Sequence, residues 1–314
     1  MLSNTSCMSN PIEFHANGKL LITGEYLVLA GATALALPVR FGQDMVVIPA
    51  NPGMIYWESS MPGGKWFSAQ IELTAFHIVT TSSLKVAEGL KKLLVAVRKL
   101  DPKFLAEDGN GWKVHVQSDY PLAWGLGSSS TLCSLVASWA GVDPFRLYRM
   151  ISSGSGYDIA CADQKKMIFY TLQDVPLIVT AIAGPALRNC TWFVYLGNKQ
   201  DTATEVATFN AAKNYTPSQV DRVSHISSLI CEASTTDELM QLVNEHEVLM
   251  SGILCKPAIS DRFPGFPGTV KSLGAWGGDF AMFVSGNEPA EVKNILIREG
   301  FSTIFSFSEI AAKP

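Results

Sequence analysis

The residues best suited to chemistry lie in "YPLAWGLGSSSTLCSLV", residues 120–136, where glycines and serines precede an apolar run. Backbone N–H groups at the start of a helix lack carbonyl partners and carry partial positive charge, so they attract anions. Gly125 and Gly127 can adopt positive φ and let the backbone approach a phosphate. Three hydroxyl groups follow as donors or metal ligands: Ser128, Ser129 and Ser130. We therefore predict a phosphate-binding turn, with a serine-capped glycine turn as the plainer alternative.

Three further stretches place charged residues beside glycines. In "NGKLLITGEYLVLAG", Lys19 could meet a phosphate or a reacting hydroxyl, and Glu25 could orient that lysine or a substrate group. In "SSGSGYDIACA", Asp158 follows a glycine-serine turn, where a helix N-cap is the common alternative to a catalytic role. "VKSLGAWGGDFAMFVSG" has three glycines running into a strand, as an ordinary hairpin loop also would.

Several established site patterns are absent. The sequence has no GxxxxGK[ST], and "GLGSSS" lacks the third glycine of the dinucleotide fingerprint. A Walker-type kinase and a Rossmann dehydrogenase are therefore unsupported. In "NEHEVL", His246 has no second histidine at helical spacing, so we expect a solvated helix face there rather than a metal site.

Composition limits the class of protein. The 314 residues are 47% hydrophobic and carry a net charge of −4, which argues for a globular chain and against nucleic-acid or anionic-membrane partners. The six scattered cysteines lack metal-binding spacing and are expected to be reduced. We find no export signal or membrane span, so the expected location is the cytoplasm.

The hydrophobic periodicity predicts an α+β chain. Strands with turns are expected over 14–50, an amphipathic helix over 82–100, a strand over 111–120 with Val114 and Val116 on one face, and a helix over 128–140. Later strands are expected at 166–172, 176–182, 191–197, 280–286 and 301–307, with helices at 235–254 and 289–300. This order predicts two domains divided near residues 180–190.

Taken in order, "GKLLITGEYLVLAG", "PLAWGLGSSS" and "KSLGAWGGDF" resemble the three motifs of the GHMP kinases. Within that family, "GEY", "GSGYDIA" and "GGD" are most similar to the mevalonate and phosphomevalonate kinase branch, and to phosphomevalonate kinase in particular. The resemblance implies a domain like ribosomal protein S5 domain 2 over 1–185 and a ferredoxin-like domain over 186–314. It also implies ATP and Mg²⁺ as cofactors and a small molecule of isoprenoid biosynthesis as substrate.

The resemblance also implies roles for particular residues. Asp158 would accept a proton from the acceptor oxygen or orient it, and Lys19 would stabilise charge and hold that aspartate ionised. The ATP phosphates would lie on Gly125, Leu126, Gly127, Ser128, Ser129 and Ser130, with Ser129, or its neighbour Ser128, on the magnesium side. The substrate would contact Glu25, Tyr26, Gly156, Tyr157, Thr202, Gly274, Gly277 and Gly278.

The sequence departs from the family in two places. The interval "VDPFRLYRMIS" lacks the glutamate that binds magnesium in many members, and Trp276 interrupts the last glycine run, where it could narrow the substrate pocket, stack on the nucleotide or pack as core. A phosphorylated acceptor would need extra cations, with candidates Arg40, Lys165, Lys166 and Lys271.

The alternatives are a homoserine or sugar kinase and a non-catalytic nucleotide- or metabolite-binding relative. A monomer or homodimer is expected.

Overall fold

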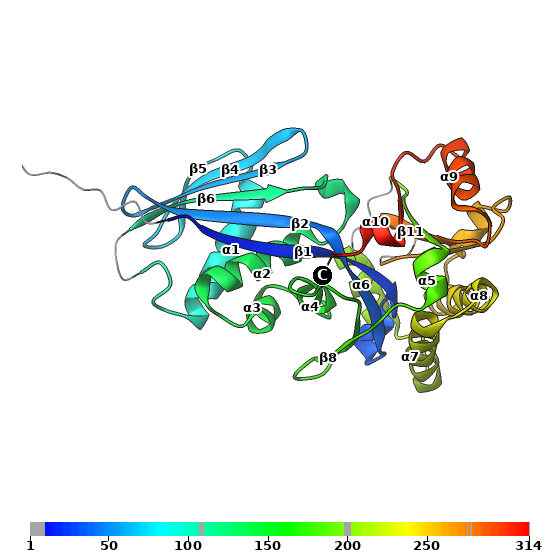
Figure 1. Ribbon diagram of the computed structural model, residues 1–314. Helices are drawn as coiled ribbons and strands as arrows, with labels where there is room; N and C mark the ends of the chain where they lie inside the picture. The colour runs from blue at the N-terminus through cyan, green and yellow to red at the C-terminus, as the bar shows by residue number, and fades with distance from the viewer. Residues whose placement is uncertain (1–9, 107–109, 198–201, 275, 277, 314) are drawn as a thin grey trace, which may run out of the picture. The chain divides into compact units, whose positions relative to one another are not determined.

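The computed structural model describes residues 10–106, 110–197, 202–274, 276 and 278–313 (Figure 1). The chain forms two compact units that interleave along the sequence. Unit 1 contains residues up to Ala16, Gly42–Leu122 and Ser128–Ser153, and unit 2 contains Asn17–Phe41, Ala123–Gly127 and the chain from Gly154 onward. These units are compact bodies rather than family domains, so the division into 1–185 and 186–314 stays a prediction.

Unit 1 is a twisted sheet with helices on one face (Figure 1). Its strands run in the order β5-β4-β3-β6-β2, in which the β3–β6 pair is parallel and the other three pairs are antiparallel. The elements are β3 (Met54–Met61), β4 (Gly64–Glu72), β5 (His77–Thr81), α1 (Leu84–Leu100), β6 (Gly111–Ser118), α2 (Ser128–Ala140) and α3 (Pro144–Ile151), together with the later part of β2 (Ala34–Ala50).

The expected helices and strand of unit 1 are confirmed. Helix α1 buries Ala87, Leu90, Leu94 and Val97, three or four residues apart, against the sheet. Val114 and Val116 share the buried face of β6. Helix α2 ends before Gly141, which has φ 66°, and Asp143 caps α3 through the N–H of Arg146 at 2.7 Å.

Unit 2 contains a second, antiparallel sheet in the order β10-β11-β9-β12. Strand β7 pairs with the first residues of β2 and with β8, as the paired-strand prediction for 166–182 required. The strands of this unit are β7 (Ile168–Thr171), β8 (Leu177–Thr180), β9 (Thr191–Tyr195), β10 (Thr269–Ser272), β11 (Phe280–Val284) and β12 (Ile304–Ser306), together with part of β1 (Ile12–Thr23).

Helices α5, α8 and α10 pack on this sheet, and α7 packs on η1, which follows β1. Helices α7 and α8 pack against each other (Figure 1), and α8 also packs on β10 and β11. The helices are η1 (Leu27–Ala30), α4 (Tyr157–Cys161), α5 (Pro185–Asn189), α6 (Thr202–Ala212), α7 (Pro217–Glu232), α8 (Thr236–Leu254), η3 (Ile259–Arg262), α9 (Pro289–Arg298) and α10 (Phe307–Ile310), with η2 (Leu122–Trp124) where the units meet along the chain.

None of the helices in the described part of the chain is both long enough and apolar enough to cross a membrane.

Candidate active site

Strand β1 brings the first motif to two other segments of unit 2. The N–H of Asn17 donates to the carbonyl of Ala162, and its side chain donates to the carbonyl of Gln164 at 2.9 Å. Two residues on, the N–H of Lys19 donates to the carbonyl of Leu126 at 3.0 Å. A proline at position 17 could make neither Asn17 contact. β1 therefore fixes both the segment after Asp158 and the Gly125 loop, residues 123–127.

Gly125 must be glycine for two reasons. Its φ of 67° lies in the left-handed region, and a Cβ built on it would lie 1.7 Å from Oδ2 of Asp279. Gly127 also has positive φ, at 95°, so the expected curl of this turn is confirmed. The carboxylate of Asp279 thus lies directly against the Gly125 loop.

Lys19 lies beside this loop and is half-buried. Its Nζ donates to the carbonyl of Gly125 at 3.1 Å and lies 5.7 Å from the centre of the Tyr157 ring. Burial lowers the pKa of Lys19 below its usual value, while the charges of Asp158 and Asp279 act to raise it. Two carboxylates from different motifs therefore act electrostatically on one lysine.

Asp158 lies in the first turn of α4 rather than at its N-cap, which is Gly156 with φ 83°. Its Oδ1 accepts from the N–H of Ile159 at 3.1 Å. The side chain is half-buried, so it is neither a core residue nor a fully solvated one. The structure thus brings Lys19 near Tyr157 and Asp158, with Gly156 directly before them in the chain, and their roles stay predictions.

The three serines open α2, which belongs to unit 1, directly after Gly127 along the chain. Ser129 is exposed, Ser128 is half-buried and Ser130 is buried. Within unit 1, the exposed hydroxyl of Ser129 is therefore the most accessible of the three.

Glu25 lies in a buried cluster of ionisable side chains. It forms an ion pair with Lys271, and both side chains have no exposed surface. Lys271 also donates to the carbonyl of Ser272 at 2.8 Å. The prediction of Lys271 as a pocket cation is therefore wrong, because a buried, paired ammonium cannot meet a substrate phosphate. Glu25 pairs with Lys271 rather than Lys19, and it could contact a substrate only if its surroundings opened.

Helix α8 supplies the rest of this cluster. Nε2 of His246 lies 3.3 Å from Oε2 of Glu25 and 3.5 Å from the N–H of Gly24. His246 is fully buried, so the expectation of a solvated helix face was wrong. Burial, together with the charge of Lys271, holds the pKa of His246 well below its usual value, which keeps the ring neutral. Glu247 accepts from the N–H groups of Ser272 and Ile259.

Glu247 should make folding stability depend on pH. Burial raises the pKa of Glu247 from 4.5 to about 7, so between these values the folded state binds a proton that the unfolded state does not. Its contribution to the free energy of unfolding should therefore fall by about 3 kcal/mol as pH rises through this window. We expect Glu247→Gln to gain stability relative to the unmodified chain from pH 5 to pH 8 in urea titrations.

The matched control for Glu247→Gln is Glu245→Gln on the same helix. Glu245 is partly exposed and pairs with Arg222 at 2.5 Å, so its replacement removes a carboxylate of α8 without changing the buried cluster. His246 should lower stability below about pH 6.5 in all three proteins, since its neutral form is the folded one. Parallel stability curves for Glu247→Gln and the unmodified chain would contradict the assignment.

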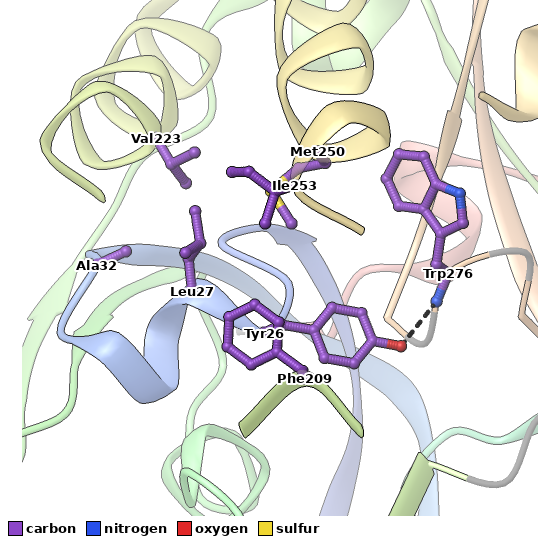
Figure 2. Close-up of a cluster of buried hydrophobic side chains, with 8 residues drawn as sticks. All are labelled: Tyr26, Leu27, Ala32, Phe209, Val223, Met250, Ile253 and Trp276. Atoms are coloured by element: carbon purple, nitrogen blue, oxygen red, sulfur yellow. Dashed lines mark hydrogen bonds between the residues drawn. The ribbon is translucent and has the colours of Figure 1, made fainter. Parts of the chain in front are cut away.

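Tyr26 and Trp276 join the first motif to the last through a hydrophobic core (Figure 2). The Tyr26 hydroxyl accepts from the N–H of Trp276 at 3.2 Å, and its ring lies 5.4 Å from that of Phe209. Trp276 donates through Nε1 to the carbonyl of Pro257 at 2.9 Å. Of the three fates predicted for Trp276, core packing is the one observed. Tyr26 is buried too, and burial raises its pKa to about 12.

The remaining predicted contacts are only partly described. Gly274 has φ 65° and Gly278 is buried. Gly277 and the side chain of Thr202 lie outside the described residues. Asp279 is the residue that the sequence prediction missed. Its only signal was the "GGD" of the last motif, because the contact with Gly125 joins segments far apart along the chain.

No protein-family model matches the sequence, and no curated protein matches it. Solved structures do match. Mevalonate kinase of Methanococcus jannaschii has a TM-score of 0.72 at 17% identity, covering 98% of this chain and 99% of that one. Phosphomevalonate kinase of Streptococcus pneumoniae, in complex with phosphomevalonate and AMPPNP, has a TM-score of 0.70 at 13% identity over 94% and 99%. The chain has the GHMP kinase fold.

The likeness extends to other proteins with the GHMP kinase fold. Galactokinase of Lactococcus lactis, complexed with galactose, has a TM-score of 0.65 at 11% identity over 98% of this chain and 94% of that one. At these identities the likeness is one of fold, and the predicted α+β class is confirmed. Because these neighbours are named for different substrates, the shared fold alone identifies no substrate for this chain.

Proposed function

We propose that this chain is an ATP-dependent small-molecule kinase that phosphorylates phosphomevalonate or mevalonate. The observation that carries the proposal is the grouping of Lys19, Asp158 and the Gly125 loop within unit 2. A lysine, a carboxylate and a curled glycine turn are the parts that phosphoryl transfer needs for positioning and charge neutralisation. The motif resemblance to phosphomevalonate kinase and the shared fold support the acceptor class.

In this proposal the nucleotide phosphates bind along the consecutive residues Gly125 to Ser130. Asp158 orients the acceptor oxygen or takes its proton, and Lys19 stabilises the negative charge that develops on the transferred group. Of the predicted acceptor-binding cations, Arg40, Lys165 and Lys166 are exposed and stay predictions.

A magnesium ion bound together with the nucleotide phosphates fits this arrangement. The described residues contain no group of three or more His, Cys, Asp or Glu side chains that could hold a metal ion. Mg²⁺ prefers oxygen ligands and often keeps several waters and substrate phosphates, so the exposed hydroxyl of Ser129 would be sufficient as a protein ligand. When bound, the ion would neutralise phosphate charge.

The proposal is tested by coupled ADP release with mevalonate, phosphomevalonate, homoserine and galactose, one acceptor at a time. We expect turnover with phosphomevalonate or mevalonate and little with the other two. Turnover with homoserine or galactose alone would assign a different kinase activity. ATP binding without turnover on any acceptor would favour the non-catalytic alternative, for which the absence of a glutamate in 142–152 is the supporting observation.

Ser129→Ala should weaken the use of Mg·ATP more than the binding of the acceptor. The loss removes one hydroxyl ligand or donor at the phosphates, which we expect to raise the KM for Mg·ATP and its dependence on free Mg²⁺. Steady-state kinetics with each substrate varied in turn would measure this. Thr180→Ala, which changes an exposed hydroxyl on β8, is the control. An equal rise in both KM values would argue against the assignment.

A further inference from the structure

Asp279 lies where the last motif meets the Gly125 loop. Its Oδ2 occupies the space that a Cβ on Gly125 would fill, and its carbonyl accepts from the N–H of Leu196 at 2.8 Å. The hydroxyl of Tyr195, next to Leu196, donates to the carbonyl of Ala123 at 3.1 Å. The last residue of β9 and the residue after it thus hold the Gly125 loop and Asp279, respectively, which fixes both sides of their contact within unit 2.

The same loop also accepts a hydrogen bond from Lys19, which lies on β1. The Lys19 Nζ donates to the carbonyl of Gly125, and the Asp279 carboxylate lies where a Cβ on Gly125 would be. Both charged groups therefore lie against the same residue. The groups that act electrostatically on Lys19 are Asp158, Asp279 and the thiol of Cys161. Burial raises the pKa of Cys161, which keeps that thiol neutral. The compensating negative charge is therefore carried by the two aspartates.

The two aspartates cannot have equal roles during transfer. If Asp158 takes the proton of the acceptor, it becomes neutral and no longer compensates Lys19, which is half-buried. Partly burying an ammonium without a counter-charge costs free energy. Lys19 must nevertheless stay charged, because in this proposal it stabilises the negative charge that develops on the transferred phosphate. Asp279 belongs to a different motif and takes no part in the proton transfer in this scheme, so its carboxylate can still compensate the charge of Lys19.

We propose that Asp279 is a positioning residue that holds Lys19 and the Gly125 loop in place while Asp158 changes its protonation. The inference rests on the proposed kinase function for its role in transfer. The arrangement of Lys19 and Asp279 itself is a property of the free protein, and it can be measured without substrate.

The experiment follows the titration of Lys19 by NMR in protein labelled with ¹³C-lysine, with Lys19→Arg assigning the signal. In Asp279→Asn the midpoint should move to lower pH, because a carboxylate that favours the charged lysine has been removed. Asp279→Glu keeps the charge and should restore the midpoint towards that of the unmodified chain. Asp221→Asn, an exposed position on α7, should leave it unchanged.

Kinetics then test the role in transfer. Asp279→Asn should lower kcat, by up to about 100-fold, more than it changes the KM of the acceptor. The basic limb of its kcat/KM profile should move to lower pH together with the Lys19 midpoint, and Asp279→Glu should recover part of both. If Asp279→Asn does not fold, Asp279→Ser, whose smaller neutral side chain also removes the carboxylate, should shift the Lys19 midpoint in the same direction.

An unchanged Lys19 midpoint in folded Asp279→Asn would overturn the inference, as would an equal loss in Asp279→Glu. Failure of the kinase proposal is a separate result. It would appear as an unmodified chain without phosphate transfer to any acceptor, whatever the Lys19 titration shows.

Discussion

Asp158→Ala is expected to lower kcat by about 100- to 10,000-fold while leaving ATP binding largely intact. The side chain is half-buried in the first turn of α4, and its charge acts on Lys19, so its removal takes away the group proposed to orient the acceptor without opening a core. ADP release at saturating substrates measures the rate, and titration calorimetry with ATP measures binding.

The control for this variant is Asp163→Ala. Asp163 is exposed shortly after α4, so its loss changes the same net charge nearby without touching Lys19. Circular dichroism should show that both variants fold. Undiminished turnover in Asp158→Ala would remove Asp158 from the chemistry, and loss of ATP binding along with turnover would assign it to the nucleotide instead.

Lys271→Met is expected to destabilise the folded chain by about 3–5 kcal/mol. Lys271 and Glu25 are both without exposed surface, so removal of the ammonium leaves a carboxylate buried without its partner. Burial already raises the pKa of Glu25, and the charge of Lys271 opposes that rise. Urea unfolding at pH 7 measures the loss.

Lys65→Met is the matched surface control, because Lys65 and Glu58 form an exposed pair at 3.3 Å. We expect that change to fall within about 0.5 kcal/mol of the unmodified chain. A double replacement, Glu25→Leu with Lys271→Met, should regain much of the lost stability. Equal small effects at Lys65 and Lys271 would mean that water reaches the buried pair.

Much of the fold follows from the sequence alone. The spacing of Ala87, Leu90, Leu94 and Val97 predicts α1, and the alternation of Val114 and Val116 predicts β6, because each pattern buries one face. The loop glycines predicted a curl that the φ angles of Gly125 and Gly127 confirm. Local chemistry decides these features, so a local pattern can reveal them.

The buried charges could not be assigned by the residue types alone. His246 and Glu247 are polar and suggest a solvated face, yet they continue the three- and four-residue spacing of Leu239, Leu242 and Val243 on α8. That periodicity was the signal for their burial. The partner of Glu25 is Lys271, far along the chain, and no short-range pattern specifies which distant charge meets it.

The same limit applies to the site. Lys19 and Asp158 were predicted because each stands next to glycines in a recognisable motif. Asp279 was missed because its significance comes from a contact with Gly125, which only the folded chain brings about.

The ion pair of Glu25 and Lys271 also restricts how this sequence can diverge. Either residue replaced alone leaves an uncompensated interior charge, so single changes at these positions should be removed by selection. Tolerated descendants should instead carry paired exchanges, such as a reversed pair or two apolar side chains. Positions 25 and 271 should then co-vary although they belong to different motifs, because their side chains form one buried pair.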